Sequence, residues 1–139
     1  MSGLTKVSME DVSPSRRLGG GIRPLLSPTS VGATAGFLGT MSLDRGDFVA
    51  AHYHPYSEEF IFVAEGRVLL RIDEDELLLG THEAAMVPKT RSHRIENVSA
   101  SPALLVFQMA PLAPTPEQGH VEVEPVPYPD APPPSLRTR

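Results

Sequence analysis

Short apolar segments, each closed by a turn signal, are the feature of this sequence that most restricts its fold. Between residues 34 and 110 they follow one another at near-even spacing, without sustained 3.6-residue periodicity. The expected strands are Thr34–Leu43, Phe48–Tyr53, Glu59–Ala64, Arg67–Ile72, Glu76–Leu79, Ala84–Val87, His93–Asn97 and Ala103–Met109. Many short strands joined by tight turns predict an all-β, single-domain sandwich or barrel.

The segments on either side of this central zone differ from it in composition. Residues 1–33 form a mixed lead-in, and we expect it to pack partly on the barrel or on a second copy of the chain. Most of the 15 prolines lie from Pro111 onward and exclude regular helix and central strand there. We therefore expect a Pro-rich strap over residues 111–127 and a disordered tail over residues 128–139.

The absence of cysteine limits the chemistry of this 139-residue domain. It excludes disulfides, thiolate ligands and a cysteine nucleophile, so any metal must have nitrogen and oxygen ligands. A net charge of -5 without a basic stripe argues against a nucleic-acid partner. The sequence shows neither the apolar core of a signal peptide nor a membrane-length apolar run. We expect a cytoplasmic protein with no membrane partner.

His52 and His54 stand one residue apart on an expected strand, so both imidazoles face the same side of the sheet. Glu59 opens the next strand after a turn, and His93 begins a later one. Each residue alone is as readily a surface or hydrogen-bonded side chain. Together, three imidazoles and one carboxylate suit zinc, iron, manganese, nickel or copper.

Two motifs with the spacing of the cupin family connect these residues. The first, G-x5-H-x-H-x4-E-x6-G, is matched without a gap by Gly46, His52, His54, Glu59 and Gly66, and its spacing selects Glu59 over Glu58. The second, P-x4-H-x3-N, is matched by Pro88, His93 and Asn97, although Thr90 stands where the family has glycine. The resemblance implies a jelly-roll barrel with a metal inside its mouth, held by His52, His54, Glu59 and His93.

Three further blocks, RRLGGGIRPLLSPTSVGATAGFLG, HYHPYSEEFIFV and APLAPTPEQGHVEVE, cover most of residues 16–124 in order. They resemble the cupin-type aromatic polyketide cyclases of bacterial type II pathways, of the tetracenomycin and resistomycin kind. This likeness implies a polyketide substrate, an intramolecular aldol cyclisation and aromatisation of a poly-β-ketone, and zinc, because no redox change is needed. It also implies a homodimer, which an unprotected strand edge in residues 22–33 would favour. Other polyketide synthase or cyclase components are further partners that the likeness suggests.

His120 lies in the strap, and two interpretations of it stay open. The strap packs along the barrel wall, or it carries His120 over the mouth as an extra ligand or a catalytic proton-transfer group. The resemblance favours this second role for His120 over His82, which sits at a turn and should be exposed. If His120 binds the metal, Glu59 would orient a ligand histidine instead.

Two other functions are compatible with the same ligands. One is a metal-dependent dioxygenase or related oxidoreductase that acts on a phenolic or quinone ring, and the other is a non-catalytic cupin that binds a small molecule. Metal identity and oxygen consumption distinguish them. We expect Gln108 to be a hydrogen-bonded core residue, within a core that includes Phe37, Met41, Phe60, Phe62, Phe107 and Met109.

Overall fold

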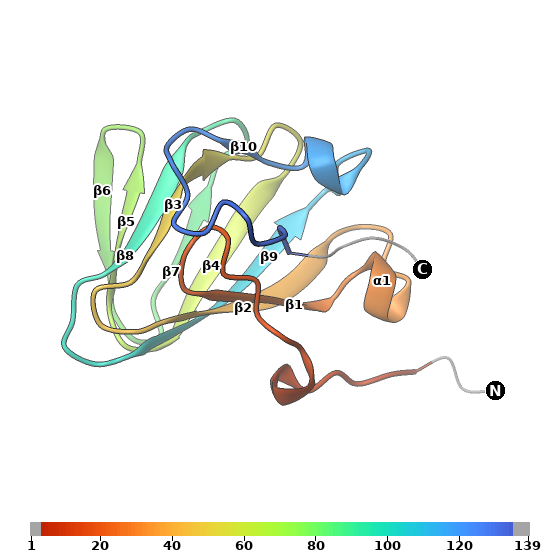
Figure 1. The fold of residues 1–139 in the computed structure, drawn as a ribbon, viewed down its shortest axis with the longest axis horizontal. Coiled ribbons are helices and arrows are strands. Elements are labelled where there is room, and N and C mark those ends of the chain that lie inside the picture. Colours follow the sequence, from red (N-terminus) through yellow and green to blue (C-terminus); the bar gives the residue numbers. More distant parts are fainter. Residues whose placement is uncertain (1–3, 135–139) are drawn as a thin grey trace.

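The computed structural model describes residues 4–134 and contains two five-stranded antiparallel sheets that face one another (Figure 1). The strand order is β1-β2-β9-β4-β7 in the first sheet and β10-β3-β8-β5-β6 in the second. The strands are β1 Gly21–Leu26, β2 Phe37–Leu43, β3 Phe48–Tyr53, β4 Glu58–Glu65, β5 Val68–Ile72, β6 Asp75–Leu79, β7 Ala84–Val87, β8 His93–Asn97, β9 Ala103–Ala110 and β10 Val121–Glu122. The predicted all-β fold is confirmed.

Helix is confined to three short turns in the described residues: η1 Met9–Asp11, α1 Pro28–Val31 and η2 Pro116–Gln118. A capping box between Ser27 and Ser30 fixes the start of α1, and Gly32 ends it in the left-handed conformation. No helix in the described part of the chain has the length and apolar character needed to span a membrane.

The sheets extend beyond the predicted barrel at both ends. Neither β1 nor β10 was expected, because β1 contains Pro24 and β10 lies among the prolines of the strap. Both are edge strands in the sheet order, and edges tolerate proline because one side of the strand needs no hydrogen-bond donor. β10 pairs with β3, so the strap is held against a strand of the second sheet.

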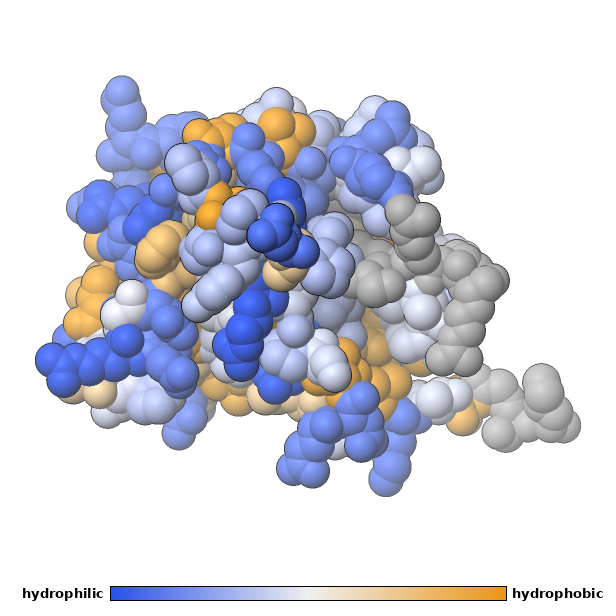
Figure 2. Space-filling model, in the orientation of Figure 1, coloured by the Kyte–Doolittle hydropathy of each residue, from blue (hydrophilic) through white to orange (hydrophobic). Residues whose placement is uncertain are grey.

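The core lies between the inner faces of the two sheets. Its fully buried side chains come from both sheets and include Leu43, Ile61, Leu70, Ile95 and Leu105. Polar side chains predominate on the face seen in Figure 2, where apolar groups form separate small patches. The inner faces therefore supply most of the apolar burial that stabilises the fold.

The prediction that Phe60, Phe62 and Gln108 are core residues was wrong. Residues along β4 alternate between exposed and buried, and Glu59 and Ile61 are inward-facing positions. Phe60 and Phe62 consequently point outward, with 43% and 41% of their surface exposed. Gln108 is exposed on the same outer face, because β9 pairs it with Phe60. The rings form an apolar outer surface on the first sheet.

The N-terminal lead-in covers the edge of β1 that was expected to be unprotected. Ser15 and Ile22 exchange backbone hydrogen bonds of 2.8 and 2.9 Å, and Arg23 Nε donates to the Val12 carbonyl at 2.9 Å. These contacts satisfy backbone groups that would otherwise pair with another chain. At Ile22 and Arg23 the edge of β1 is therefore covered by the lead-in of the same chain.

The structure describes the first part of the predicted tail, residues 128–134. Residues 128–134 lie against the N-terminal lead-in, where Tyr128 N–H donates to the Arg17 carbonyl at 3.3 Å. Ser15 Oγ donates to the Pro132 carbonyl at 2.9 Å. Within this segment Ala131 N–H donates to the Tyr128 carbonyl at 3.0 Å and closes a turn, and the carbonyls of Pro129, Ala131 and Pro132 accept from Arg17 and Ser15. The remainder of the predicted tail, residues 135–139, lies outside the described residues.

Candidate metal centre

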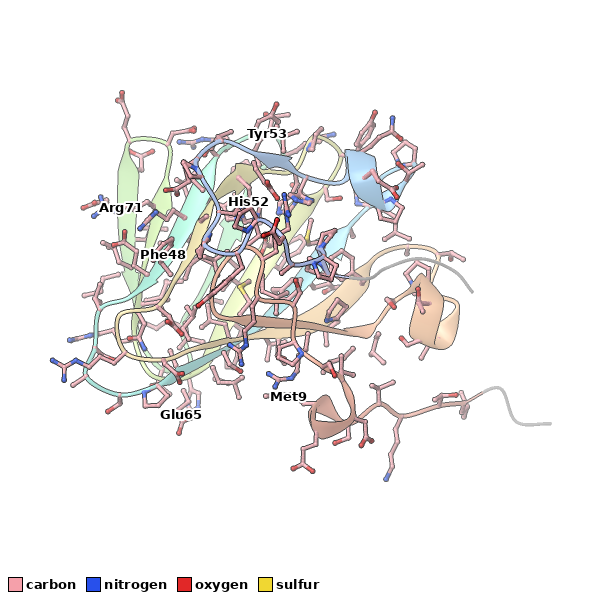
Figure 3. The ribbon with its side chains drawn as sticks, viewed as in Figure 1. Met9, Phe48, His52, Tyr53, Glu65 and Arg71 are labelled. Carbon is pink, nitrogen blue, oxygen red and sulfur yellow. The ribbon has the colours of Figure 1, made fainter. Side chains whose placement is uncertain are left out.

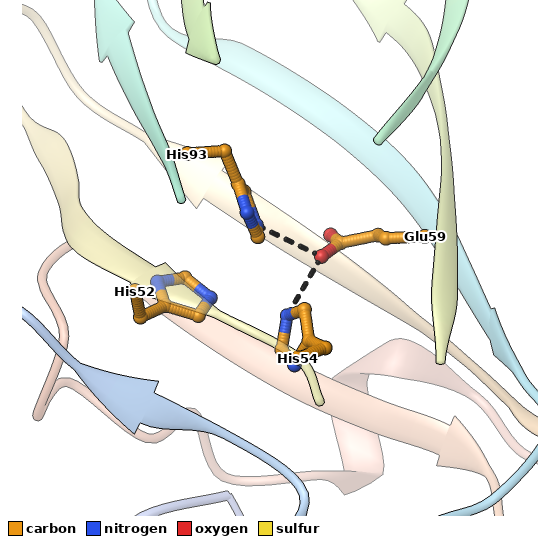
Figure 4. A group of neighbouring side chains, drawn as sticks. All are labelled: His52, His54, Glu59 and His93. Atoms are coloured by element: carbon orange, nitrogen blue, oxygen red, sulfur yellow. Dashed lines mark hydrogen bonds and ion pairs between the residues drawn. The ribbon is translucent and has the colours of Figure 1, made fainter. Parts of the chain in front are cut away.

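Four predicted ligand residues meet between the two sheets (Figure 4). His52 on β3 and His93 on β8 are direct partners across the second sheet, and His54 follows the end of β3. Glu59 enters from β4 of the first sheet. One potential ligand atom from each residue lies within 4.8 Å of all the others. Figure 3 shows His52 directed inward, into the space between the sheets.

Left-handed backbone positions shape the turns of the two motifs, and one of these turns lies beside the cluster. Gly46 and Gly66 of the first motif adopt φ values of 80° and 94°, which favour glycine. Thr90, at the glycine position of the second motif, adopts φ 72° and so keeps the left-handed conformation with a side chain present. Its N–H donates to the His54 carbonyl at 2.9 Å. The departure from the family motif therefore preserves the loop that supports His54.

Backbone carbonyls orient two of the imidazoles. His52 Nδ1 lies 2.7 Å from the Ala50 carbonyl, and His54 Nδ1 lies 2.9 Å from the Gly119 carbonyl. Because a carbonyl can only accept, each Nδ1 carries a proton, and in the neutral ring Nε2 is left with the lone pair. This is the tautomer in which Nε2 is a metal ligand, and the carbonyl is the partner that fixes the ring.

Burial and charge set the protonation of the cluster. Even His54, the most exposed of the four, has only 8% of its surface accessible. Burial, reinforced by the neighbouring histidines, lowers the pKa of His52 well below its ordinary value. Burial opposes ionisation of Glu59, but His93 and His54 outweigh it and lower the pKa of this carboxyl. Burial likewise opposes protonation of His54, but Glu59 raises its pKa. A neutral His52 and an ionised Glu59 are metal-binding forms.

The cluster fits a divalent metal ion. Glu59 Oε1 lies 3.0 Å from both His54 Nε2 and His93 Nε2. The contact with His54 lacks hydrogen-bond geometry, so this buried nitrogen has no hydrogen-bond partner. A buried imidazole nitrogen without a partner is costly unless it binds something. A metal ion between the four groups would satisfy it, and the nitrogen and oxygen donors suit first-row metals.

A cavity of about 780 Å³ lies over the cluster. Its walls are mainly apolar and include Phe37, Met41, Phe107 and Met109 from the first sheet and Val49 and Ile95 from the second. The two ends of the chain supply further lining residues, here called the rim, which include Leu18, Leu112, Pro116, His120 and Pro132–Pro134. No local sequence pattern indicates that Leu18 or the terminal prolines line the cavity, because these residues reach it only through long-range packing.

His120 lies at this rim and outside the four-residue cluster. Its ring centre is 6.1 Å from that of His52, and its Nε2 lies 3.2 Å from Glu122 Oε2. The described structure thus groups Glu59, rather than His120, with the three histidines. His82 is exposed, as expected, and its ring stacks on Phe62 on the outside of the molecule.

Comparisons with known proteins agree with this geometry. Residues 39–109 match the family model described as "Cupin domain". The chain is 47% identical over 136 residues to "Tetracenomycin polyketide synthase protein TcmJ" of Streptomyces glaucescens, covering 98% of this chain and 91% of that protein. It is 42% identical to "Polyketide synthase CurC" of Streptomyces cyaneus, covering 85% and 77%.

A solved structure shows the same fold at low sequence identity. An uncharacterised protein with a double-stranded β-helix domain from Klebsiella pneumoniae superposes with a TM-score of 0.68 at 18% identity, covering 89% of this chain and 99% of that one. The matched family model includes all four clustered residues, His52, His54, Glu59 and His93. The chain therefore belongs to the cupin family and has its jelly-roll fold.

Proposed function

We propose that the protein is a metal-dependent polyketide cyclase that closes and aromatises a ring in a poly-β-ketone intermediate of aromatic polyketide biosynthesis. The observation that carries this proposal is a buried His/Glu cluster at the floor of a large apolar cavity. The names of the Streptomyces relatives, which are polyketide synthase proteins, support the substrate class. A flexible chain with regularly spaced ketones fits a large cavity with apolar walls and a cluster of polar groups at its floor.

The chemistry follows from the placement of these groups. His52, His54, Glu59 and His93 would hold the metal, which supplies Lewis acidity to a carbonyl oxygen when bound. The apolar walls would fold the chain so that one methylene lies beside one ketone carbon. His120, at the rim, would take a proton from the methylene between two carbonyls. The new C–C bond turns the ketone into an alcohol, and loss of water leaves the unsaturated ring.

Zinc is the proposed metal because this reaction transfers protons and forms a C–C bond without a net redox change. The dioxygenase alternative instead needs a redox-active ion and molecular oxygen. The cytoplasmic location and the involvement of other synthase or cyclase components stay predictions.

The first test supplies the purified protein to a minimal synthase that releases a poly-β-ketone, and follows cyclised products by mass spectrometry. We expect a defined cyclised product that disappears after chelation and returns with zinc, without oxygen consumption. The exposed His82→Ala variant, far from the cavity, serves as a control and should behave as the unmodified protein. Oxygen uptake coupled to turnover would favour the dioxygenase. A stoichiometric complex without turnover would favour the non-catalytic binding protein.

The expected homodimer is also a proposal, and the outer face of the first sheet supports it. A groove of about 440 Å³ on this face is lined by Leu38, Phe60, Ile61, Phe62, Ala84, Ala85, Met86, Val106, Phe107 and Gln108. None of these residues is ionisable. Two copies of a chain with net charge -5 repel one another, and an uncharged apolar face lets them meet with the least repulsion. We therefore propose a second copy of the chain as its occupant.

Light scattering after gel filtration tests this proposal. We expect a mass of twice 15.0 kDa for the unmodified chain and a shift to 15.0 kDa for Phe62→Lys, because a buried ammonium group would oppose association. Leu78→Lys is the matched control, since Leu78 is also exposed but lies on β6 of the other sheet. A monomeric unmodified chain, or a dimer unaffected by Phe62→Lys, would contradict the proposed surface.

A further inference from the structure

The strap strand β10 places two polar side chains beside the metal cluster. In its pairing with β3, Glu122 is the direct partner of His52. Directly paired residues of antiparallel strands face the same side, so the Glu122 side chain lies on the side of the sheet that carries the cluster. His120 is two residues away and lines the cavity. This arrangement puts a carboxylate next to the rim histidine.

Arg17 holds both oxygens of the Glu122 carboxylate. Arg17 Nε donates to one carboxylate oxygen at 2.9 Å, and Arg17 Nη2 donates to the other at 3.1 Å. Arg17 is itself fixed, because its Nη1 donates to the carbonyls of Pro129 and Ala131. A bidentate contact of this kind restricts both the position and the plane of a carboxylate. The N-terminal lead-in and the segment after β10 thus jointly fix Glu122.

The fixed carboxylate in turn determines the state of His120. His120 Nε2 lies 3.2 Å from Glu122 Oε2, and an ionised carboxylate can only accept, so this nitrogen carries a proton. The lone pair of the neutral ring is then on Nδ1, which is the atom left for a substrate in the cavity. A carboxylate behind a histidine fixes orientation and tautomer in this way at many catalytic sites.

We propose that Glu122 and Arg17 are positioning residues for His120: Arg17 fixes the Glu122 carboxylate, which holds His120 with Nε2 protonated and Nδ1 open to the substrate. This inference relies on the proposed cyclase function only for the identity of the substrate. The orientation and tautomer of His120 can be measured without a substrate. It extends the reactive site to a residue near the start of the chain and another near its end.

Glu124 supplies a matched control. Its carboxylate accepts from the Ala51 backbone N–H and, at 2.6 Å, from Arg94 Nη1. The Glu124 side chain therefore attaches the same strap to β3 and β8, whereas the Glu122 side chain attaches it to Arg17 of the lead-in. Among the described contacts it has none with His120. A role limited to holding the strap in place would make Glu122 and Glu124 equivalent, whereas positioning of His120 would not.

Imidazole ¹⁵N NMR of the full chain as purified distinguishes these roles, with the His120 signals assigned by their loss in His120→Gln. We expect the Nε2-protonated tautomer in the unmodified protein, in Glu124→Ala and in Glu122→Gln, which retains an oxygen acceptor. Glu122→Ala should give a mixture of tautomers, and Arg17→Ala should shift the His120 signals in the same direction. The cyclisation rate should fall roughly 10- to 100-fold in Glu122→Ala and recover in Glu122→Gln.

Two results would overturn the proposal: an unchanged His120 tautomer in Glu122→Ala, or the same spectral change in Glu124→Ala. If the tautomer changes only in the Glu122 and Arg17 variants but the unmodified protein forms no cyclised product, the cyclase function fails while the positioning of His120 is supported.

Discussion

The His52→Ala/His93→Ala double variant is expected to lose its bound metal and, with it, cyclisation activity by at least about 10³-fold. The two residues are direct partners across β3 and β8 and supply two of the three imidazoles in the cluster. His54 and Glu59 alone would leave a site with too few protein ligands for tight binding. Loss of Lewis acidity at the substrate carbonyl would then remove several kcal/mol of transition-state stabilisation.

Plasma mass spectrometry on protein purified without added metal or chelator gives the metal content directly. Zinc near one ion per chain in the unmodified protein would support the cyclase, whereas iron, nickel, copper or manganese would support the dioxygenase. Because the double variant leaves buried Glu59 without His93, the single His52→Ala variant is measured beside it with circular dichroism. Full metal content in both variants, with the strands intact, would rule out this cluster as the metal site.

The second large effect is expected at Asn97, where replacement by alanine should lower the free energy of unfolding by about 3 kcal/mol. Asn97 Nδ2 donates to the carbonyls of Leu43 and Ser101 at 2.9 Å and of Asp44 at 3.2 Å. Its Oδ1 accepts from both N–H and Oγ of Ser99 at 2.9 Å. This buried amide at the end of β8 therefore links the second sheet to the end of β2 in the first. Its loss would leave the buried Leu43 carbonyl and several part-buried polar groups without their present partner.

Thermal and urea unfolding of Asn97→Ala measure this loss, which corresponds to a fall in Tm of roughly 10 °C for a chain of this size. Ser99→Ala is the control, because it removes one hydrogen bond to Oδ1 and leaves the three carbonyl contacts intact. We expect it to cost about 1 kcal/mol or less. If Asn97→Ala and the unmodified protein had the same free energy of unfolding, the hydrogen bonds of this amide would not contribute to the stability of the fold.

The sequence predicted the centre of the fold well, because both the strand pattern and the turn signals are local. Phe48–Tyr53, Ala84–Val87 and His93–Asn97 are strands with the predicted bounds. The alternation of side chains along β3, continued one residue past its end, predicted that His52 and His54 lie together, and the cupin motifs selected Glu59 and His93 as their neighbours. The structure brings these four residues into one buried group.

The outer parts of the fold were harder to predict because they depend on contacts between distant segments. The strand β10 forms only because β3 provides a pairing partner, and residues 128–134 are placed by Arg17, more than 100 positions earlier. The misplacement of Phe60 and Phe62 has a different origin. Hydrophobicity alone put both rings in the core, whereas the alternation along β4, with Glu59 facing inward, puts them outside.

The cavity rim and the metal cluster come from different parts of the chain, and this has a consequence for how such proteins diversify. The four clustered residues lie on or beside strands paired along their length, whereas the rim is built from the two chain ends. Terminal segments can be exchanged or extended without altering the pairing of the inner strands. Chimaeras that keep residues 34–110 and take both ends from one relative should therefore retain the metal cluster and the inner walls of the cavity, and acquire that relative's rim together with its counterpart of His120.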